Sequence, residues 1–156
     1  LVGYNYRMTN IQAAIGCAQL EMLEEFTFKR SQIWASYEKE LLPLGYFKSQ
    51  KLNADSEPGR GLFTLVLVPN LVCYRDQLID ELRLPGIDTR PIFYPMSDMP
   101  AFKTKSKQAP DLRASESLSR GGISFPSSTS LNDEEIIAIS GRTLEIIEKL
   151  ITLNMD

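Results

Sequence analysis

The chain has 156 residues, of which 43% are hydrophobic and 24% are charged, and these values exclude a disordered or collagen-like chain. Its 17 Lys and Arg against 20 Asp and Glu leave a net charge of −3, which argues against a general nucleic-acid-binding protein. No apolar run approaches the roughly 20 residues that a membrane-spanning helix needs. We therefore expect about one globular domain, with no membrane and no nucleic-acid partner.

Two features of the composition exclude further kinds of site. The sequence contains no histidine, which removes His-dependent nucleophilic catalysis and every His-ligated metal site. Two cysteines, Cys17 and Cys73, cannot build a disulfide scaffold, and no secretion signal opens the chain, so a reducing cytoplasm is expected. Because the first residue is Leu1, we expect either a processed chain or the last part of a longer protein.

The first predicted element is one helix of over thirty residues. Thr9 followed by Gln12 has the pattern of a capping box, and Pro43 marks the end of the helix. Apolar residues recur between them at helical spacing: Ile11, Ile15, Ala18, Met22, Phe26, Ile33, Tyr37 and Leu41. A helix this long in so small a chain is expected to link two domains or to line an interface.

The remaining residues predict a small α/β (α+β) domain with few strands. Glu135, three residues after Asn132, predicts a capped final helix with a buried face that includes Ile139. The other expected elements, in chain order, are a loop over 51–61, a buried strand over 62–68, a helix over 73–83, a short strand over 87–92, irregular chain over 93–109 with a basic cluster at Lys103, Lys105 and Lys107, a helix over 111–119 and a brief strand over 123–125.

The segment before the first helix carries an unusual set of donors. Asn5 and Arg7 place an amide and a guanidinium just ahead of a helix start, where they could hold a phosphate. The alternative is local turn and cap chemistry.

Two later segments are also rich in polar groups. Arg90 and Tyr94 lie on a proline-bracketed segment and could hold an anionic ligand, with a surface ion pair as the alternative. Residues 124–130 carry many hydroxyl groups, for which a simple lead-in to the final helix is the alternative.

Elsewhere the sequence predicts no self-contained active site. Cys17 lies among small helical residues and is expected in the core, and Cys73 is expected to be structural. Neighbouring carboxylates at 24–25 and 133–135 are explained by solvated helix surfaces and by helix capping. No catalytic residue and no metal ligand is therefore assigned.

Taken together, the three polar segments resemble the signature of the DegT/DnrJ/EryC1/StrS family, which are pyridoxal-phosphate (PLP) sugar aminotransferases of fold type I. The resemblance rests on residues 3–16 with Gln19-Leu20-Glu21, on 86–91 followed by Tyr94-Pro95-Met96, and on 119–128 before the final helix. It covers nearly the whole chain. The tyrosine-rich sequence of these motifs is most similar to that of perosamine-synthase-type enzymes, which act on a GDP-linked 4-keto-6-deoxy sugar.

The resemblance implies that this chain is the C-terminal part of a homodimeric enzyme. Residues 1–44 would form a cofactor loop and a linking or interface helix, and residues 45–156 the small C-terminal domain. The large domain, with the lysine that binds PLP, would lie upstream of residue 1. No lysine here matches that position, so we expect this chain alone to be inactive. The complete enzyme would transfer an amino group from glutamate to a nucleotide-linked ketosugar.

The resemblance also implies roles for single residues. Asn5 would reach the PLP phosphate of the neighbouring subunit, and Arg7 would help to bind phosphate or nucleotide sugar. Arg90 and Tyr94 would line the nucleotide-sugar pocket. Many relatives carry a histidine after the Tyr-Pro-Leu/Met stretch, where this chain has Ser97-Asp98. Serine can bind substrate by a hydrogen bond but cannot carry positive charge, so either the substrate differs or the subunit is degenerate.

The sequence is also compatible with two other hypotheses on function. Some family members are sugar dehydratases in which a histidine replaces the PLP lysine, and that position is not in this chain. The chain could also be a standalone or degenerate domain that dimerises or binds a partner through the apolar stripe of its long helix.

Overall fold

A computed structural model describes residues 3–102 and 111–153 and confirms a small α/β domain with flanking helices. The predicted basic cluster at Lys103, Lys105 and Lys107 lies outside the described residues. The elements, in chain order, are α1 (Asn10–Glu21), α2 (Leu23–Leu41), β1 (Phe47–Lys48), β2 (Phe63–Leu67), the 3-10 helix η1 (Pro69–Tyr74), α3 (Arg75–Arg83), β3 (Arg90–Pro91), the 3-10 turn η2 (Met96–Asp98), α5 (Arg113–Gly121), β4 (Gly122–Phe125) and α6 (Asp133–Leu153).

The strands form one antiparallel sheet in the order β1-β2-β4-β3. The predicted strand over 62–68 is confirmed as β2, in which Phe63 pairs with Phe125 and Leu65 with Ile123. These four side chains are all buried and share one face of the sheet. Sequence patterning did not predict β1, because a two-residue strand has no periodicity to detect.

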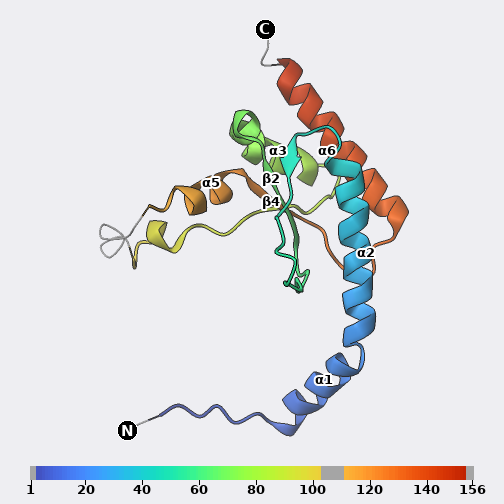
Figure 1. Cartoon of the computed structure of the whole chain (residues 1–156), viewed down its shortest axis with the longest axis vertical. Helices are drawn as coiled ribbons and strands as arrows, with labels where there is room; N and C mark the ends of the chain where they lie inside the picture. The colour runs from blue at the N-terminus through green and yellow to red at the C-terminus, as the bar shows by residue number, and fades with distance from the viewer. Residues whose placement is uncertain (1–2, 103–110, 154–156) are drawn as a thin grey trace.

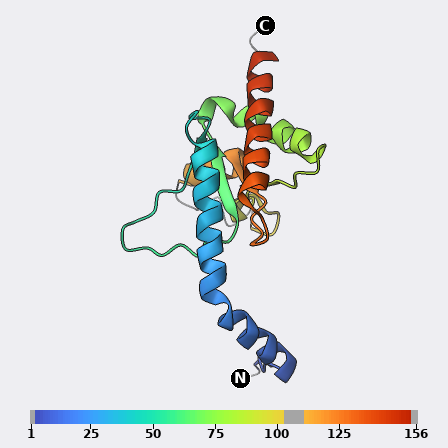
Figure 2. The ribbon, with the colours of Figure 1, turned by 90° about the vertical axis from the view of Figure 1, so that its right-hand side faces the viewer.

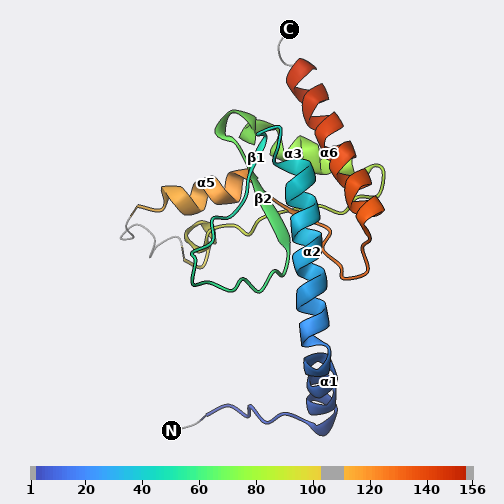
Figure 3. The same ribbon diagram turned by 45° about the vertical axis from the view of Figure 1, so that its right-hand side comes forward.

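Three helices cover this apolar face. The helices α2 and α6 pack against each other, and α3 packs against α6 (Figures 1 and 3). Removing these apolar side chains from water is the main force that holds the domain together. The buried helical residues are Ile33, Tyr37 and Leu41 from α2, Leu78, Ile79 and Leu82 from α3, and Ile136, Ile146, Ile147 and Leu150 from α6, while Ile139 is half-buried.

The prediction of a single helix of over thirty residues is wrong, because the helix breaks at Met22. Its backbone angles are φ −100° and ψ 4°, and its N–H donates to the Gln19 carbonyl oxygen at 3.3 Å, a bond of 3-10 type. Figure 2 shows α1 bending away from the line of α2. No residue of α1 is buried, so no packing keeps the two helices in line.

Both predicted capping boxes are present. In α6, the Asn132 N–H donates to a Glu135 carboxylate oxygen and the Glu135 N–H donates to Asn132 Oδ1, each at 2.9 Å. In α1, the Thr9 N–H donates to Gln12 Oε1 and the Gln12 N–H donates to Thr9 Oγ1. Each box satisfies backbone donors that a helix start leaves without partners.

Candidate functional site

The segment before α1 is extended and lies at the far end of α1 from the sheet (Figures 1 and 3). Asn5 Oδ1 accepts a hydrogen bond from the Arg7 N–H at 3.0 Å, so local turn chemistry is present. The Asn5 amide nitrogen and the Arg7 guanidinium are exposed and have no partner among the described residues. Both donors therefore remain available to an anion.

The second polar segment begins at the edge of the sheet. Only Arg90–Pro91 form a strand, shorter than the predicted 87–92, and they pair with Ser124 and Ile123 of β4. Pro91 has no N–H to donate, so it cannot extend the ladder. The next residue still does, because the Ile92 N–H donates to the Gly122 carbonyl oxygen at 3.2 Å. This bond aligns the chain that leads to Tyr94.

The guanidinium of Arg90 pairs with the Asp88 carboxylate at 2.9 Å from Nη2 and 3.3 Å from Nε. The surface ion pair weighed from the sequence is therefore present. Both side chains are largely exposed, at 74% for Arg90 and 67% for Asp88. An exposed pair of this kind contributes only about 0–1 kcal/mol, so it holds the Arg90 side chain weakly.

The other two predicted substrate residues follow on the same stretch of chain. Tyr94 is exposed, and Ser97 is half-buried within η2. Neither side chain has a hydrogen-bond partner in the part of the chain that the structure describes. The fold thus puts Arg90, Tyr94 and Ser97 on one segment. It does not bring Asn5 and Arg7 to them, since α1 and α2 separate the two groups (Figure 1).

The hydroxyl groups of the serine-rich segment 124–130 make hydrogen bonds within the fold. Ser127 Oγ accepts the Phe63 N–H and donates to the Phe125 carbonyl oxygen, both at 2.8 Å. Ser128 and Ser130 join their hydroxyl groups at 2.8 Å. These hydroxyls have partners, as expected for a lead-in to α6.

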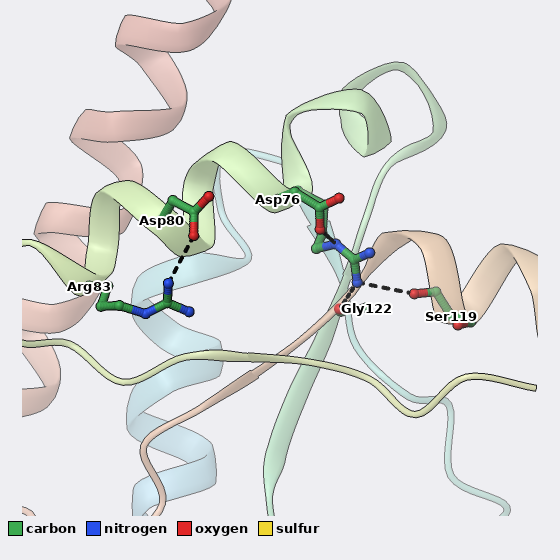
Figure 4. A network of polar contacts seen from close by, with 6 residues as sticks. Asp76, Asp80, Arg83, Ser119 and Gly122 are labelled. Carbon is green, nitrogen blue, oxygen red and sulfur yellow. Dashed lines mark hydrogen bonds and ion pairs between the residues drawn. The ribbon is translucent and has the colours of Figure 1, made fainter.

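One half-buried arginine with long-range contacts was missed by sequence reasoning. Arg75, the first residue of α3, has a side chain only 12% exposed, and its Nη1 lies 3.2 Å from the Ser119 carbonyl oxygen and 3.5 Å from that of Gly122 (Figure 4). Its contacts are 44 and 47 residues away along the chain. No local pattern could therefore have marked it.

The cysteines and carboxylates supply no alternative centre. Cys17 is exposed, so its predicted place in the core is wrong, because α1 has no packing partner within the described residues. Cys73 is also exposed, and its thiol lies 3.9 Å from the Asn70 carbonyl oxygen. Over residues 3–102 and 111–153, no three side chains of the metal-ligating types gather as a metal site, and no helix has the length and hydropathy to cross a bilayer.

Two small hollows lie away from these segments. One, of about 110 Å³, is lined by residues that include Trp34, Glu38 and Arg60, and the other, of about 120 Å³, by residues that include Ser36 and Asp133. Sites for drug-sized ligands usually measure about 300–1,000 Å³, so neither is large enough for a nucleotide sugar. The exposed Arg90 segment would need further protein around it to enclose such a ligand.

Several solved structures of aminotransferases share this fold. PseC of Helicobacter pylori, an aminotransferase involved in pseudaminic acid biosynthesis, superposes with a TM-score of 0.85 at 21% identity, over 96% of this chain and 40% of PseC. The PLP form of Spr1654 of Streptococcus pneumoniae, which carries the name putative sugar aminotransferase, gives a TM-score of 0.79 at 22% identity, over 92% of this chain and 36% of Spr1654. At these identities the likeness establishes the fold.

Sequence comparison establishes the family as well as the fold. GDP-perosamine synthase of Caulobacter vibrioides is 38% identical in an alignment of 144 positions that covers 87% of this chain and 36% of that protein. The chain thus spans little more than a third of this relative's length. Residues 1–142 match the family described as the DegT/DnrJ/EryC1/StrS aminotransferases. The chain therefore belongs to the DegT/DnrJ/EryC1/StrS aminotransferase family.

Proposed function

We propose that this chain is the C-terminal part of a PLP-dependent aminotransferase that moves an amino group from glutamate to a GDP-linked 4-keto-6-deoxy sugar. The observation that carries the proposal is the family match over residues 1–142, together with 38% identity to a GDP-perosamine synthase. In this proposal residues 1–44 link to the large domain and residues 45–156 form the small domain.

The cofactor proposal rests on free donors at the N-terminal segment. PLP carries a phosphate, and the Asn5 amide and the Arg7 guanidinium are the donor types that bind one. Both are without a partner among the described residues, so the donor set fits the group. When bound, PLP supplies the electron sink for amino transfer. The residues here would hold and orient it, and no lysine of this chain is assigned to bind it.

The substrate proposal rests on the segment from β3 to η2. Arg90 would bind the pyrophosphate in place of Asp88, because a guanidinium can donate two parallel hydrogen bonds to phosphate oxygens. Tyr94 would pack against or hydrogen-bond the nucleotide sugar, and Ser97 would donate a hydrogen bond to it. Asp98 puts a negative charge beside this position, so the pyrophosphate is expected nearer to Arg90.

A homodimer would reconcile the two groups of residues. The segment before α1, which carries Asn5 and Arg7, lies at the far end of α1 from the sheet, on which Arg90 lies, yet cofactor and substrate must meet in one active site (Figure 1). We propose that Asn5 reaches the PLP of a second subunit. The exposed apolar side chains of α1, including Ile11 at 75% and Ile15 at 60%, support burial there in the complete protein. Two free cysteines fit a reducing cytoplasm.

The test is to read the coding sequence upstream of the Leu1 codon. The proposal expects a long in-frame extension that contains the PLP-binding lysine. A histidine at that position would indicate a family dehydratase instead. A start codon immediately before Leu1 would indicate a standalone domain for dimerisation or partner binding, and would overturn the proposal.

A further inference from the structure

We propose that Arg75 is a positioning residue that sets the path of the segment carrying Arg90 and Tyr94, and that it acts through the backbone carbonyl group of Gly122. The part of this inference that concerns substrate rests on the proposed function. The part that concerns geometry rests on contacts within this chain alone.

The first step is the contact between α3 and the turn into β4. Arg75 Nη1 donates to the carbonyl oxygens of Ser119 and Gly122, at 3.2 and 3.5 Å, where α5 ends and β4 begins (Figure 4). The Arg75 Nε also lies against Asp76, but it makes no aligned hydrogen bond within the described residues. The two carbonyl groups are therefore the aligned partners of this guanidinium.

The burial of Arg75 indicates that these bonds matter. Its side chain is 12% exposed, whereas the Asp76 side chain is 81% exposed. A guanidinium withdrawn from water loses favourable hydration, and hydrogen bonds from a charged donor are the means by which a protein offsets that loss. Here the ion pair with the exposed Asp76 carboxylate compensates part of that loss, and the two carbonyl oxygens of one short turn compensate the rest, so the guanidinium and the turn are held together.

The second step is the contact between that turn and β3. The Gly122 carbonyl oxygen accepts both the Arg75 guanidinium and the Ile92 N–H, the latter at 3.2 Å. The Cα of Gly122 also faces the Ile92 side chain so closely that an added Cβ would lie 2.7 Å from Ile92 Cγ2. Ile92 is thus fixed by a hydrogen bond and by close packing at the same residue.

The third step leads to the proposed substrate residues. Ile92 lies two positions from both Arg90 and Tyr94. Beyond it, Phe93 and Tyr94 are exposed, at 85% and 68%, and belong to no strand or helix. Among the described residues, the Ile92 bond is therefore the last backbone hydrogen bond to the sheet before η2, and a shift of Gly122 would be passed on to Tyr94.

The chain offers a matched control on the same helix. Arg83 is also an α3 arginine paired with an aspartate, with its Nη1 3.0 Å from Asp80, but its side chain is 67% exposed (Figure 4). Arg83→Met removes the same charge without touching the turn into β4. The test variants are Arg75→Met, which keeps the length of the side chain, and Arg75→Lys, which keeps the charge but loses the fork of donors.

The first experiment measures amide hydrogen exchange in this chain by NMR. In Arg75→Met, the Ile92 amide is expected to exchange about tenfold faster, while the Ile146 amide in the middle of α6 changes by less than about twofold. Arg83→Met is expected to leave both unchanged. An unchanged Ile92 rate, or an equal acceleration at Ile92 and Ile146, would overturn the proposal, because the second result means general destabilisation. If Arg75→Met fails to fold, Arg75→Lys is held to the same criterion.

The second experiment uses the complete protein. Arg75→Lys is expected to raise the KM for the nucleotide sugar about five- to tenfold and to leave kcat and the KM for glutamate within about twofold. Equal losses with both substrates would overturn the positioning role. Arg90→Ala separates the proposed substrate site from the proposed role of Arg75. If Arg90→Ala leaves the KM for nucleotide sugar unchanged, the substrate site at Arg90 is wrong. The exchange rate of the Ile92 amide still decides whether Arg75 positions the segment.

Discussion

The phenol of Tyr37 in α2 donates a hydrogen bond to the carbonyl oxygen of Pro126 at 3.0 Å and so joins positions 89 residues apart in the chain. The same ring stacks on Phe63 of β2, with centroids 4.7 Å apart and planes 9° from parallel. It is fully buried. One side chain thus fixes α2 against the sheet and against the chain that leads from β4 to α6.

Tyr37 should make the stability of the chain depend on alkaline pH. Burial, assisted by the negative charge of Glu135, raises the pKa of the Tyr37 phenol well above its usual range. In the unfolded chain the phenol ionises near pH 10, so the contribution is complete below pH 10 and is lost as pH rises above it. Urea unfolding should show a loss approaching about 1.4 kcal/mol per pH unit above pH 10 that Tyr37→Phe lacks.

The matched control is Tyr4→Phe, since Tyr4 is 86% exposed. It should leave the pH profile unchanged. At pH 7, Tyr37→Phe should lower the free energy of unfolding by about 0.5–1.5 kcal/mol, because it removes the bond to Pro126. Parallel pH profiles for Tyr37→Phe and the unmodified chain would contradict the assignment.

The two capping boxes should differ in their effect on stability. Asn132→Ala should lower the global free energy of unfolding by about 1 kcal/mol, because α6 carries core residues. Thr9→Ala removes an equivalent cap, but α1 buries no residue, so it should reduce helix content without moving the urea midpoint. A global loss in Thr9→Ala, measured by tryptophan fluorescence at Trp34, would mean that α1 is packed in solution.

Gly122 should tolerate no side chain. An added Cβ would lie 2.7 Å from both Ile92 Cγ2 and the Leu118 carbonyl oxygen, and the latter is backbone. Gly122→Ala should therefore lower the free energy of unfolding by about 1–3 kcal/mol. Gly141→Ala is the matched control, because nothing lies within 4 Å of its Cβ position inside α6, and it should stabilise by up to about 1 kcal/mol. Equal effects of the two changes in urea would refute the close packing at Gly122.

Asn5 should affect the cofactor more than the fold. In the complete protein, Asn5→Ala is expected to weaken PLP retention about tenfold, because one donor to the phosphate is lost, while the thermal midpoint of the apoprotein stays unchanged. Retention is followed by PLP absorbance during dialysis. Asn53→Ala, an exposed loop residue, serves as the control. Cofactor retention equal to that of the control would remove Asn5 from the phosphate site.

Local signals in the sequence predicted the elements whose cause is local. The cap of α6 depends on Asn132 and Glu135, three residues apart, and β2 is a run of apolar residues bounded by Pro69. The break at Met22 was not predictable in this way. The apolar period continues through it, and only the lack of packing around α1 decides against one straight helix.

The residues of the candidate site also differ in whether the local sequence could identify them. Arg90 and Tyr94 stood out because prolines bracket them, and the fold places them on one segment. Arg75 could not stand out, because its partners at Ser119 and Gly122 come from distant chain. The exposure of Cys17 was missed for the same reason, since helical pattern alone does not say whether another element covers it.

The most direct test of the proposed activity is to follow the amino group itself. The complete protein would be incubated with PLP, ¹⁵N-labelled glutamate and a GDP-linked 4-keto-6-deoxy sugar, and the products would be read by NMR and mass spectrometry. We predict a nucleotide sugar that carries ¹⁵N at carbon 4, with 2-oxoglutarate formed in equal amount. A sugar that loses water and takes up no ¹⁵N, or no turnover while PLP is bound, would contradict the assignment of this chain to an aminotransferase.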